Sequence, residues 1–181
     1  MKYIIIIGIL GLIAVLLMGY LYYMGFFNKI EITEKEMGPY KVVFKEHIGD
    51  YKETGKIMDE IYYSLLNGGV ETYKGFVICY DDPKVVEKDK LRSIAGSIIE
   101  EKDYDKIDQL KDKYSIKTID KTRSITTEFP FKNKMSVIFS LMKVYPELNK
   151  YIDSKGYKKG QVMEIYDIPN KKIIYLAEIK E

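Results

Sequence analysis

The sequence is poor in the residues that most often carry chemistry: it has one cysteine, Cys79, one histidine, His47, and no tryptophan. A single cysteine excludes an internal disulfide and a zinc site built from cysteines. A single histidine excludes metal motifs that need two, and a Ser-His-Asp triad would have to use His47. We therefore expect no metal and no cofactor, and we assign no catalytic residue.

An excess of charge of one sign is also missing. The chain has 29 lysines and arginines against 27 acidic residues, a net charge of +2. Proteins that bind duplex nucleic acid usually carry a basic stripe, and no long run of like charge occurs here. We therefore expect no nucleic-acid partner.

Charge is absent altogether from residues 3–27. This run exceeds the roughly 20 apolar residues that span a bilayer. A cleaved signal peptide would have a shorter apolar stretch and a small-residue cleavage site, whereas residues 22–27 are mostly bulky. Residues 1–28 are therefore predicted to form an uncleaved transmembrane anchor.

Lysines are more frequent after this run than before it. Lys29, Lys35, Lys41 and Lys45 follow it, whereas only Lys2 precedes it. By the positive-inside rule, this bias predicts a single-pass cell-membrane protein whose soluble domain faces the cytoplasm.

Residues 29–181 have the size of one domain, and they repeat a pattern. Each half contains a glycine, a short strand and a Tyr-Asp-x-Pro exit, at Tyr80–Pro83 and Tyr166–Pro169. With the flanking patterns, each half reads strand, helix, strand, strand, over about 38–101 and 119–180. The fold class is therefore predicted as α+β, a tandem pair of such modules with an antiparallel sheet and two main helices.

The individual elements follow from periodicity. The predicted strands are 30–36, 40–48, 76–79, 93–100, 122–131 and 171–179, with another before Tyr166; the predicted helices are 51–67 and 135–155. Asp50 and Glu53 have capping-box spacing, and Pro146 is expected to kink or split the second helix. Residues 103–114 are predicted to form a solvated connecting helix.

The two halves are too small to bury a core separately, so we expect one pseudo-twofold unit with a groove between them. Such grooves often bind ligands, although duplication could equally serve only to build a scaffold.

Aligning the halves on Tyr80 and Tyr166 places Glu164 at the position of Ile78. Glu164 then shares a strand face with Val162 and Tyr166. A buried carboxylate costs several kcal/mol unless it is paired, and cations over tyrosine rings gain about 0.5–2 kcal/mol. The pattern therefore suggests a receptor for an organic cation or amphipathic molecule; the alternative is that Glu164 faces solvent or pairs with a lysine.

Several short motifs together resemble a known family. They are residues 37–40 (MGPY), 47–51 (HIGDY), 80–83 (YDDP), 91–93 (LRS) and 163–166 (MEIY). In this order they resemble the GyrI-like effector-binding domain, which is attached to AraC-type and MerR-type drug-responsive regulators and also occurs alone. The resemblance covers nearly all of residues 30–181.

This resemblance implies a ligand cleft between the two modules. It matches Glu164 to the acid that contacts cationic ligands in drug-binding members, and we place Tyr166, Tyr80 and Tyr51 beside it as candidate ligand-binding residues. Residues 129–131 (FPF) depart from the first half and are expected to reshape one side. The regulators' helix-turn-helix has no counterpart here, so transcription control is not implied.

Three functions remain open from the sequence. The first is a membrane-anchored domain that binds a small cationic or amphipathic molecule. The second is a membrane adaptor whose surface binds a protein partner. The third is a hydrolase of reactive electrophiles that uses Glu164 with Tyr166 or Tyr80, although nothing in the sequence supplies an oxyanion hole.

Overall fold

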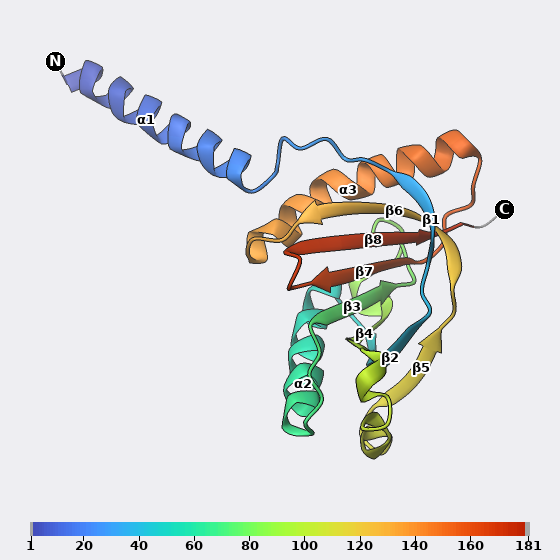
Figure 1. Cartoon of the computed structure of the whole chain (residues 1–181). Coiled ribbons are helices and arrows are strands. Elements are labelled where there is room, and N and C mark those ends of the chain that lie inside the picture. The colour runs from blue at the N-terminus through green and yellow to red at the C-terminus, as the bar shows by residue number, and fades with distance from the viewer. Residues whose placement is uncertain (1, 180–181) are drawn as a thin grey trace.

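The computed structural model describes residues 2–179 as one apolar N-terminal helix followed by an α+β domain (Figure 1). The helices are α1 (Lys2–Tyr23), α2 (Thr54–Asn67) and α3 (Lys134–Lys155). The strands are β1 (Thr33–Met37), β2 (Tyr40–Ile48), β3 (Lys74–Cys79), β4 (Arg92–Ile99), β5 (Ser115–Ile119), β6 (Thr122–Pro130), β7 (Val162–Asp167) and β8 (Lys172–Glu178). This confirms the predicted fold class and the predicted order of elements in both modules.

All eight strands form one sheet in the order β1-β6-β8-β7-β3-β4-β2-β5. The modules β2-α2-β3-β4 and β6-α3-β7-β8 meet at the antiparallel pair β3–β7. The outermost strands are exchanged, because β1 pairs with β6 and β5 pairs with β2. The turns after β1 and β5 cross so closely that a Cβ at Gly38 would lie 3.1 Å from the Asp120 carbonyl oxygen. Gly38 also has φ +96°, which favours glycine.

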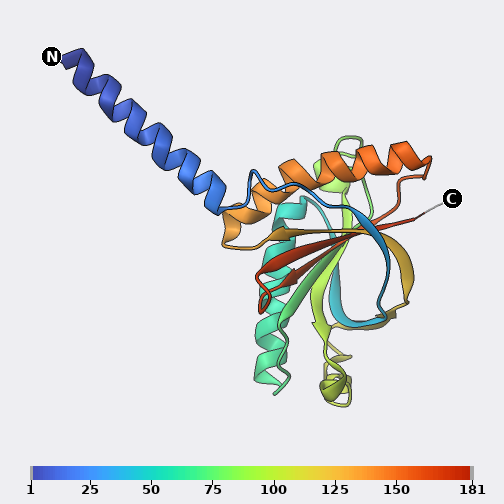
Figure 2. The ribbon, with the colours of Figure 1, turned by 45° about the horizontal axis from the view of Figure 1, so that its top comes forward.

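The sheet curls, and its two faces bury different cores (Figure 2). One face gathers apolar side chains from the central strands, among them Phe44, Phe76, Ile78 and Ile165. The other face is covered by α2 over one module and by α3 over the other. The helices therefore share one face of the sheet, and the seam β3–β7 runs between them.

Helix α3 is not split at Pro146. It runs without a break from Lys134 to Lys155, and Pro146 lies inside it. Its start is fixed by Asn133, whose side chain accepts a hydrogen bond from the Met135 amide, and its end by Gly156 at φ +70°. Burial of one face of the helix outweighs the hydrogen bond that a proline removes, so the predicted split is wrong.

The predicted capping box at the start of α2 is also wrong. The Asp50 carboxylate accepts from the Lys52 amide and caps a 3₁₀ turn, Tyr51–Glu53, that precedes the α-helix. Glu53 makes no side-chain cap. The carboxylate thus satisfies an amide of the tighter turn rather than one of the α-helix.

Residues 103–114 do not form the solvated helix that their charge suggested. This part of the chain contains two 3₁₀ turns, Glu101–Asp103 and Ile107–Leu110. Ile107 and Tyr114 are buried and pack with α2 residues in one core cluster. The segment closes the core of the first module, and burial of these two side chains outweighs the polar character of their neighbours.

Helix α1 projects away from the domain in both views (Figures 1 and 2). None of its residues is buried, and its most apolar window has a mean hydropathy of 2.9. It is the one helix among residues 2–179 with the length and composition to cross a membrane. The next residues return to the domain, because Met24 is fully buried.

Candidate functional site

A cleft of about 1540 Å³ lies between α2 and α3. Its floor is the helix-covered side of the β3–β7 seam, where Gly75, Val77 and Cys79 stand across from Tyr166, Glu164 and Val162. Gly75 has Met58 above it, at 3.2 Å from where a Cβ would be. The two modules therefore form the groove that the repeat predicted.

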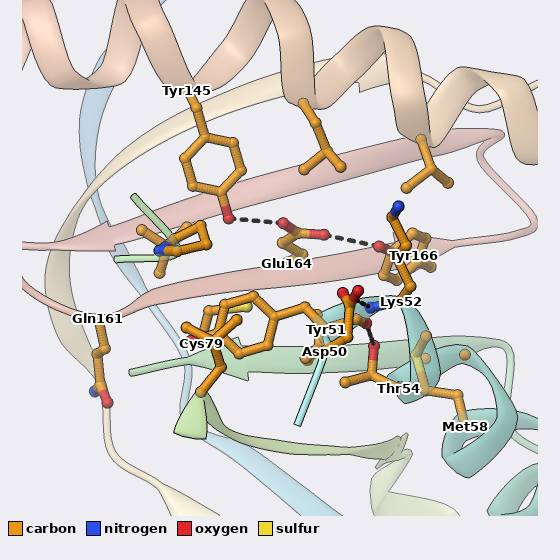
Figure 3. Close-up of a pocket in the computed structure, with 18 of the residues that line it drawn as sticks. Asp50, Tyr51, Lys52, Thr54, Met58, Cys79, Tyr145, Gln161, Glu164 and Tyr166 are labelled. Atoms are coloured by element: carbon orange, nitrogen blue, oxygen red, sulfur yellow. Dashed lines mark hydrogen bonds between the residues drawn. The ribbon is translucent and has the colours of Figure 1, made fainter. Parts of the chain in front are cut away.

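Glu164 lies at the centre of this floor (Figure 3). Only 4% of its surface is exposed. The Tyr145 hydroxyl donates to Oε1 at 2.8 Å, and the Tyr166 hydroxyl donates to Oε2 at 2.7 Å. The alternatives in which Glu164 faces solvent or pairs with a lysine are wrong: among residues 2–179 no ion pair joins it to a lysine or arginine.

The correspondence of Glu164 with Ile78 is wrong as well. Ile78 lies on the opposite face of the sheet, in the core with Phe76 and Ile165. Glu164 is paired with Val77 on strand β3 and with Tyr175 on strand β8. Directly paired residues of neighbouring strands point to the same face of the sheet. The acid still stands beside an aliphatic residue of the other module, but the alignment was out of step with the two-residue period.

Burial dominates the electrostatics of the cleft floor. It raises the pKa of Glu164, and the hydroxyls of Tyr166 and Tyr145 offset part of that rise by donating to the carboxylate. Burial also raises the pKa of both tyrosines well above the ordinary value, and the nearby acid raises it further. The tyrosines are therefore neutral donors, which stabilise the carboxylate without cancelling its charge.

A buried contact between Tyr175 and Ser140 helps to position Tyr145 over Glu164. The hydroxyls of Tyr175 and Ser140 lie 2.6 Å apart, and both residues are buried. The Tyr175 ring also meets the Tyr145 ring edge to face, with centroids 5.8 Å apart. Since Ser140 and Tyr145 both belong to α3, these contacts fix the helix, and with it the Tyr145 hydroxyl, over Glu164.

Tyr51 lines the cleft, but its hydroxyl already has partners. The hydroxyl donates to the carbonyls of Asp81 and Arg92, and it accepts from the Asp81 amide at 3.1 Å. The Asp81 carboxylate in turn binds the Arg92 guanidinium through both oxygens. Burial raises the pKa of Tyr51 to about 12. The Tyr51 hydroxyl therefore stabilises the Tyr-Asp-x-Pro loop, and only the ring of Tyr51 is available to contact a ligand in the cleft.

Tyr80 lies at the rim, with 38% of its surface exposed. Burial raises its pKa first, and Glu46, rather than Glu164, is the acid that raises it further. The structure thus brings Glu164 and Tyr166 into direct contact, with Tyr51 and Tyr80 further out on the cleft wall.

Two cleft residues were not predicted from the sequence. Tyr145 falls within the predicted helix 135–155 and Cys79 within the predicted strand 76–79, and neither was singled out as a ligand-binding residue. Burial, together with Glu164, raises the pKa of the Cys79 thiol, so the thiol stays protonated beside the acid. The sequence around Tyr145 did not indicate a role in the cleft, because its hydrogen-bond partner, Glu164, lies on another element, strand β7. Among residues 2–179, no cluster of His, Cys, Asp and Glu could hold a metal ion.

The FPF segment, residues 129–131, contributes to the core and to the cleft wall. Phe129 is buried in the core under α3. Phe131 lines the cleft and packs edge to face on Tyr166, with ring centroids 6.1 Å apart. An aromatic wall therefore stands beside the acid on the side of the second module.

Residues 30–179 match the GyrI-like small molecule binding domain. The chain belongs to this family. The resemblance identified from the five short motifs is thereby confirmed, and the matched range contains every residue of the cleft.

Curated relatives share the sequence at a distance. The human testis-expressed protein 264 is 23% identical over all of this chain, and its mouse homologue is 24% identical over 77% of it. The match spans 63% of the human protein and 48% of the mouse protein.

Solved structures share the fold. The C-terminal domain of EcmrR has a TM-score of 0.58 at 13% identity, with 84% of this chain and 98% of that one covered. SAV2435, solved bound to tetraphenylphosphonium, has a TM-score of 0.54 at 10% identity, with 83% and 94% covered. A hydrolase from Listeria innocua has a TM-score of 0.54 at 10% identity, with 86% and 95% covered.

Proposed function

We propose that this protein is a membrane-anchored receptor for a small organic cation, which binds over Glu164 in the cleft between α2 and α3. One observation carries the proposal: the carboxylate is almost completely buried, and within residues 2–179 its hydrogen-bond donors are the neutral hydroxyls of Tyr145 and Tyr166. A buried charge without a counter-ion is costly, and a bound cation would remove that cost.

The walls of the cleft favour an organic cation over a bare metal ion. Tyrosine and phenylalanine rings surround the acid, and aromatic faces attract cations that are large and weakly hydrated. A metal ion would require several oxygen or nitrogen ligands, whereas the floor offers one carboxylate. The large apolar lining also suits an amphipathic molecule, since it can bury the carbon framework that carries the charge.

The family and one fold neighbour agree with this proposal. The family is described as binding small molecules, and SAV2435 was solved with a lipophilic cation. At 10% identity the neighbour shows a shared fold, so tetraphenylphosphonium serves here as a probe of the chemistry rather than as the natural ligand.

The proposal includes the anchor. Helix α1 has the length and hydropathy of a membrane span, and the lysines that follow it favour a cytoplasmic domain. The full-length protein should stay with membranes through an alkaline carbonate wash. Release into the supernatant would show that α1 does not span the bilayer, and removal of the first residues from the mature protein would show a signal sequence.

A thermal-shift screen tests the ligand class. A chain of residues 24–181 is heated with tetraphenylphosphonium, with a neutral tetraphenyl analogue and with a lipophilic anion. Only the cation should bind over Glu164 and so raise the melting temperature. At a hundredfold excess over Kd, a bound ligand stabilises the native state by about 2.7 kcal/mol. A shift that appears only with a protein partner would favour the adaptor, and consumption of an electrophile would favour the hydrolase.

A further inference from the structure

The chain after α1 is fastened to the start of α3 rather than left as a loose tether. Met24 is fully buried, and a Cβ at Gly25 would lie 2.9 Å from Pro130 Cγ. The Phe26 ring packs edge to face on Phe139, with centroids 5.4 Å apart. Lys143 donates to the carbonyls of Phe26 and Asn28. These contacts hold the first turns of α3 beside the end of α1, as both ribbon views show (Figures 1 and 2).

The same turns of α3 expose a row of large apolar side chains. Met135, Ile138, Leu141 and Met142 are 41%, 49%, 42% and 61% exposed. Their spacing places them along one side of a helix. Ile138, Leu141 and Met142 also line the cleft, so this apolar row forms its rim. We call these four residues the α3 rim.

Basic side chains lie at the same end of the helix. Lys132 and Lys134 are exposed, and the Lys132 ammonium lies 5.3 Å from the centre of the Tyr23 ring at the end of α1. Apolar residues flanked by lysines are the composition of a surface that enters the boundary between headgroups and acyl chains, where lysines meet anionic lipids.

We propose that the α3 rim lies on the bilayer that holds α1, so that the cleft opens at the membrane surface and receives its ligand from the lipid. This inference rests on the proposed anchor. The contacts of residues 24–28, which we call the joint, support it: they follow directly on the span and pack against the first turns of α3. A partner protein would need no such joint, whereas a bilayer occupant follows from the position of the span itself.

Single tryptophans can test this orientation, because the chain has no tryptophan of its own. Ile138→Trp and Met142→Trp report on the α3 rim. Leu66→Trp is the matched control, since Leu66 is an apolar residue, 46% exposed, at the far end of α2. Leu10→Trp reports on the span. Each full-length variant is reconstituted into vesicles of phosphatidylcholine and phosphatidylglycerol, with and without brominated acyl chains.

Bromine should quench both rim tryptophans by roughly half, since interfacial side chains enter about 5–10 Å into the headgroup and acyl boundary. The control at Leu66 should keep its fluorescence. If the rim variants behave like the Leu66 control while Leu10→Trp is quenched, the anchor stands and the rim does not touch the bilayer. If Leu10→Trp also escapes quenching, the anchor itself is wrong and this inference fails with it.

Discussion

The hydroxyl of Tyr145, on helix α3, lies 2.8 Å from Glu164 Oε1 on strand β7. With the Tyr166 hydroxyl on the other oxygen, both oxygens of a buried carboxylate accept hydrogen bonds from groups that remain neutral. The charge is thus oriented but not balanced within the protein. The predictions below follow from this imbalance and from the contacts that maintain it.

The first prediction concerns pH. The pKa of Glu164 is raised from its ordinary value of 4.5, so the folded domain holds this proton to higher pH than the unfolded chain does. Its contribution to stability is therefore fully present below pH 4.5 and is lost as the pH rises through the raised pKa. Glu164→Gln should match the wild type in acid and be more stable than it at neutral pH. Urea melts of both proteins across this range check the difference.

A cation reverses this dependence. It binds best when Glu164 is ionised, so affinity for tetraphenylphosphonium should rise with pH over the same window and proton release should accompany binding. An affinity that stays flat across the window would mean that Glu164 does not titrate in the site.

The second prediction concerns the tyrosine donors. Tyr166→Phe removes a hydrogen bond to the carboxylate, so the pKa of Glu164 should rise further and the pH midpoint of cation binding should move upward. A hydrogen bond to a charged group contributes about 1.5–3 kcal/mol, and this is the expected scale of the stabilisation that the ionised Glu164 loses in Tyr166→Phe. Titrations of binding against pH measure it.

The chain offers a matched control for this variant. The Tyr73 hydroxyl donates to Glu71 at 2.7 Å, two residues away along the chain, as Tyr166 does to Glu164, but both residues of this second pair are exposed. Tyr73→Phe should leave the midpoint in place. Equal effects of the two variants would contradict a special role for the buried pair.

The third prediction separates support from binding. Tyr51→Phe leaves the ring in the cleft but leaves the Asp81 amide without its partner, so it should destabilise the domain by about 1–3 kcal/mol. Affinity for the cation, measured well below the melting temperature, should change little. A large loss of affinity at unchanged stability would make the Tyr51 hydroxyl a ligand contact instead.

The fourth prediction concerns the joint below α1. A chain of residues 24–181 keeps the buried Met24 and the Phe26 contact, whereas a chain of 29–181 lacks both. Loss of a buried methionine side chain costs about 2–5 kcal/mol, and each kcal/mol lowers the melting temperature of such a domain by roughly 2–4 °C. Scanning calorimetry of the two chains should show the longer one melting higher; identical curves would mean that the joint is loose.

Much of this fold could be predicted from the sequence, because each half repeats the same alternation and the same Tyr-Asp-x-Pro exit. Glu164 could be singled out because the two-residue period places it on a face with Tyr166. Tyr145 could not, since its contact depends on how α3 packs over β7. The prediction of a solvated helix over residues 103–114 was wrong for a related reason: Ile107 and Tyr114 are buried by tertiary packing that local charge does not reveal.

The most direct test of the account is a calorimetric titration of tetraphenylphosphonium into three chains of residues 24–181: the wild type, Glu164→Gln and Glu147→Gln. Glu147 is an exposed acid on α3 and serves as the control for the loss of one surface charge. Glu164→Gln should weaken binding by about 1–3 kcal/mol, the range for a charge-assisted contact, while Glu147→Gln binds like the wild type. Equal affinities for all three chains would contradict the account, because a cation bound over Glu164 must bind more weakly when the carboxylate charge is removed.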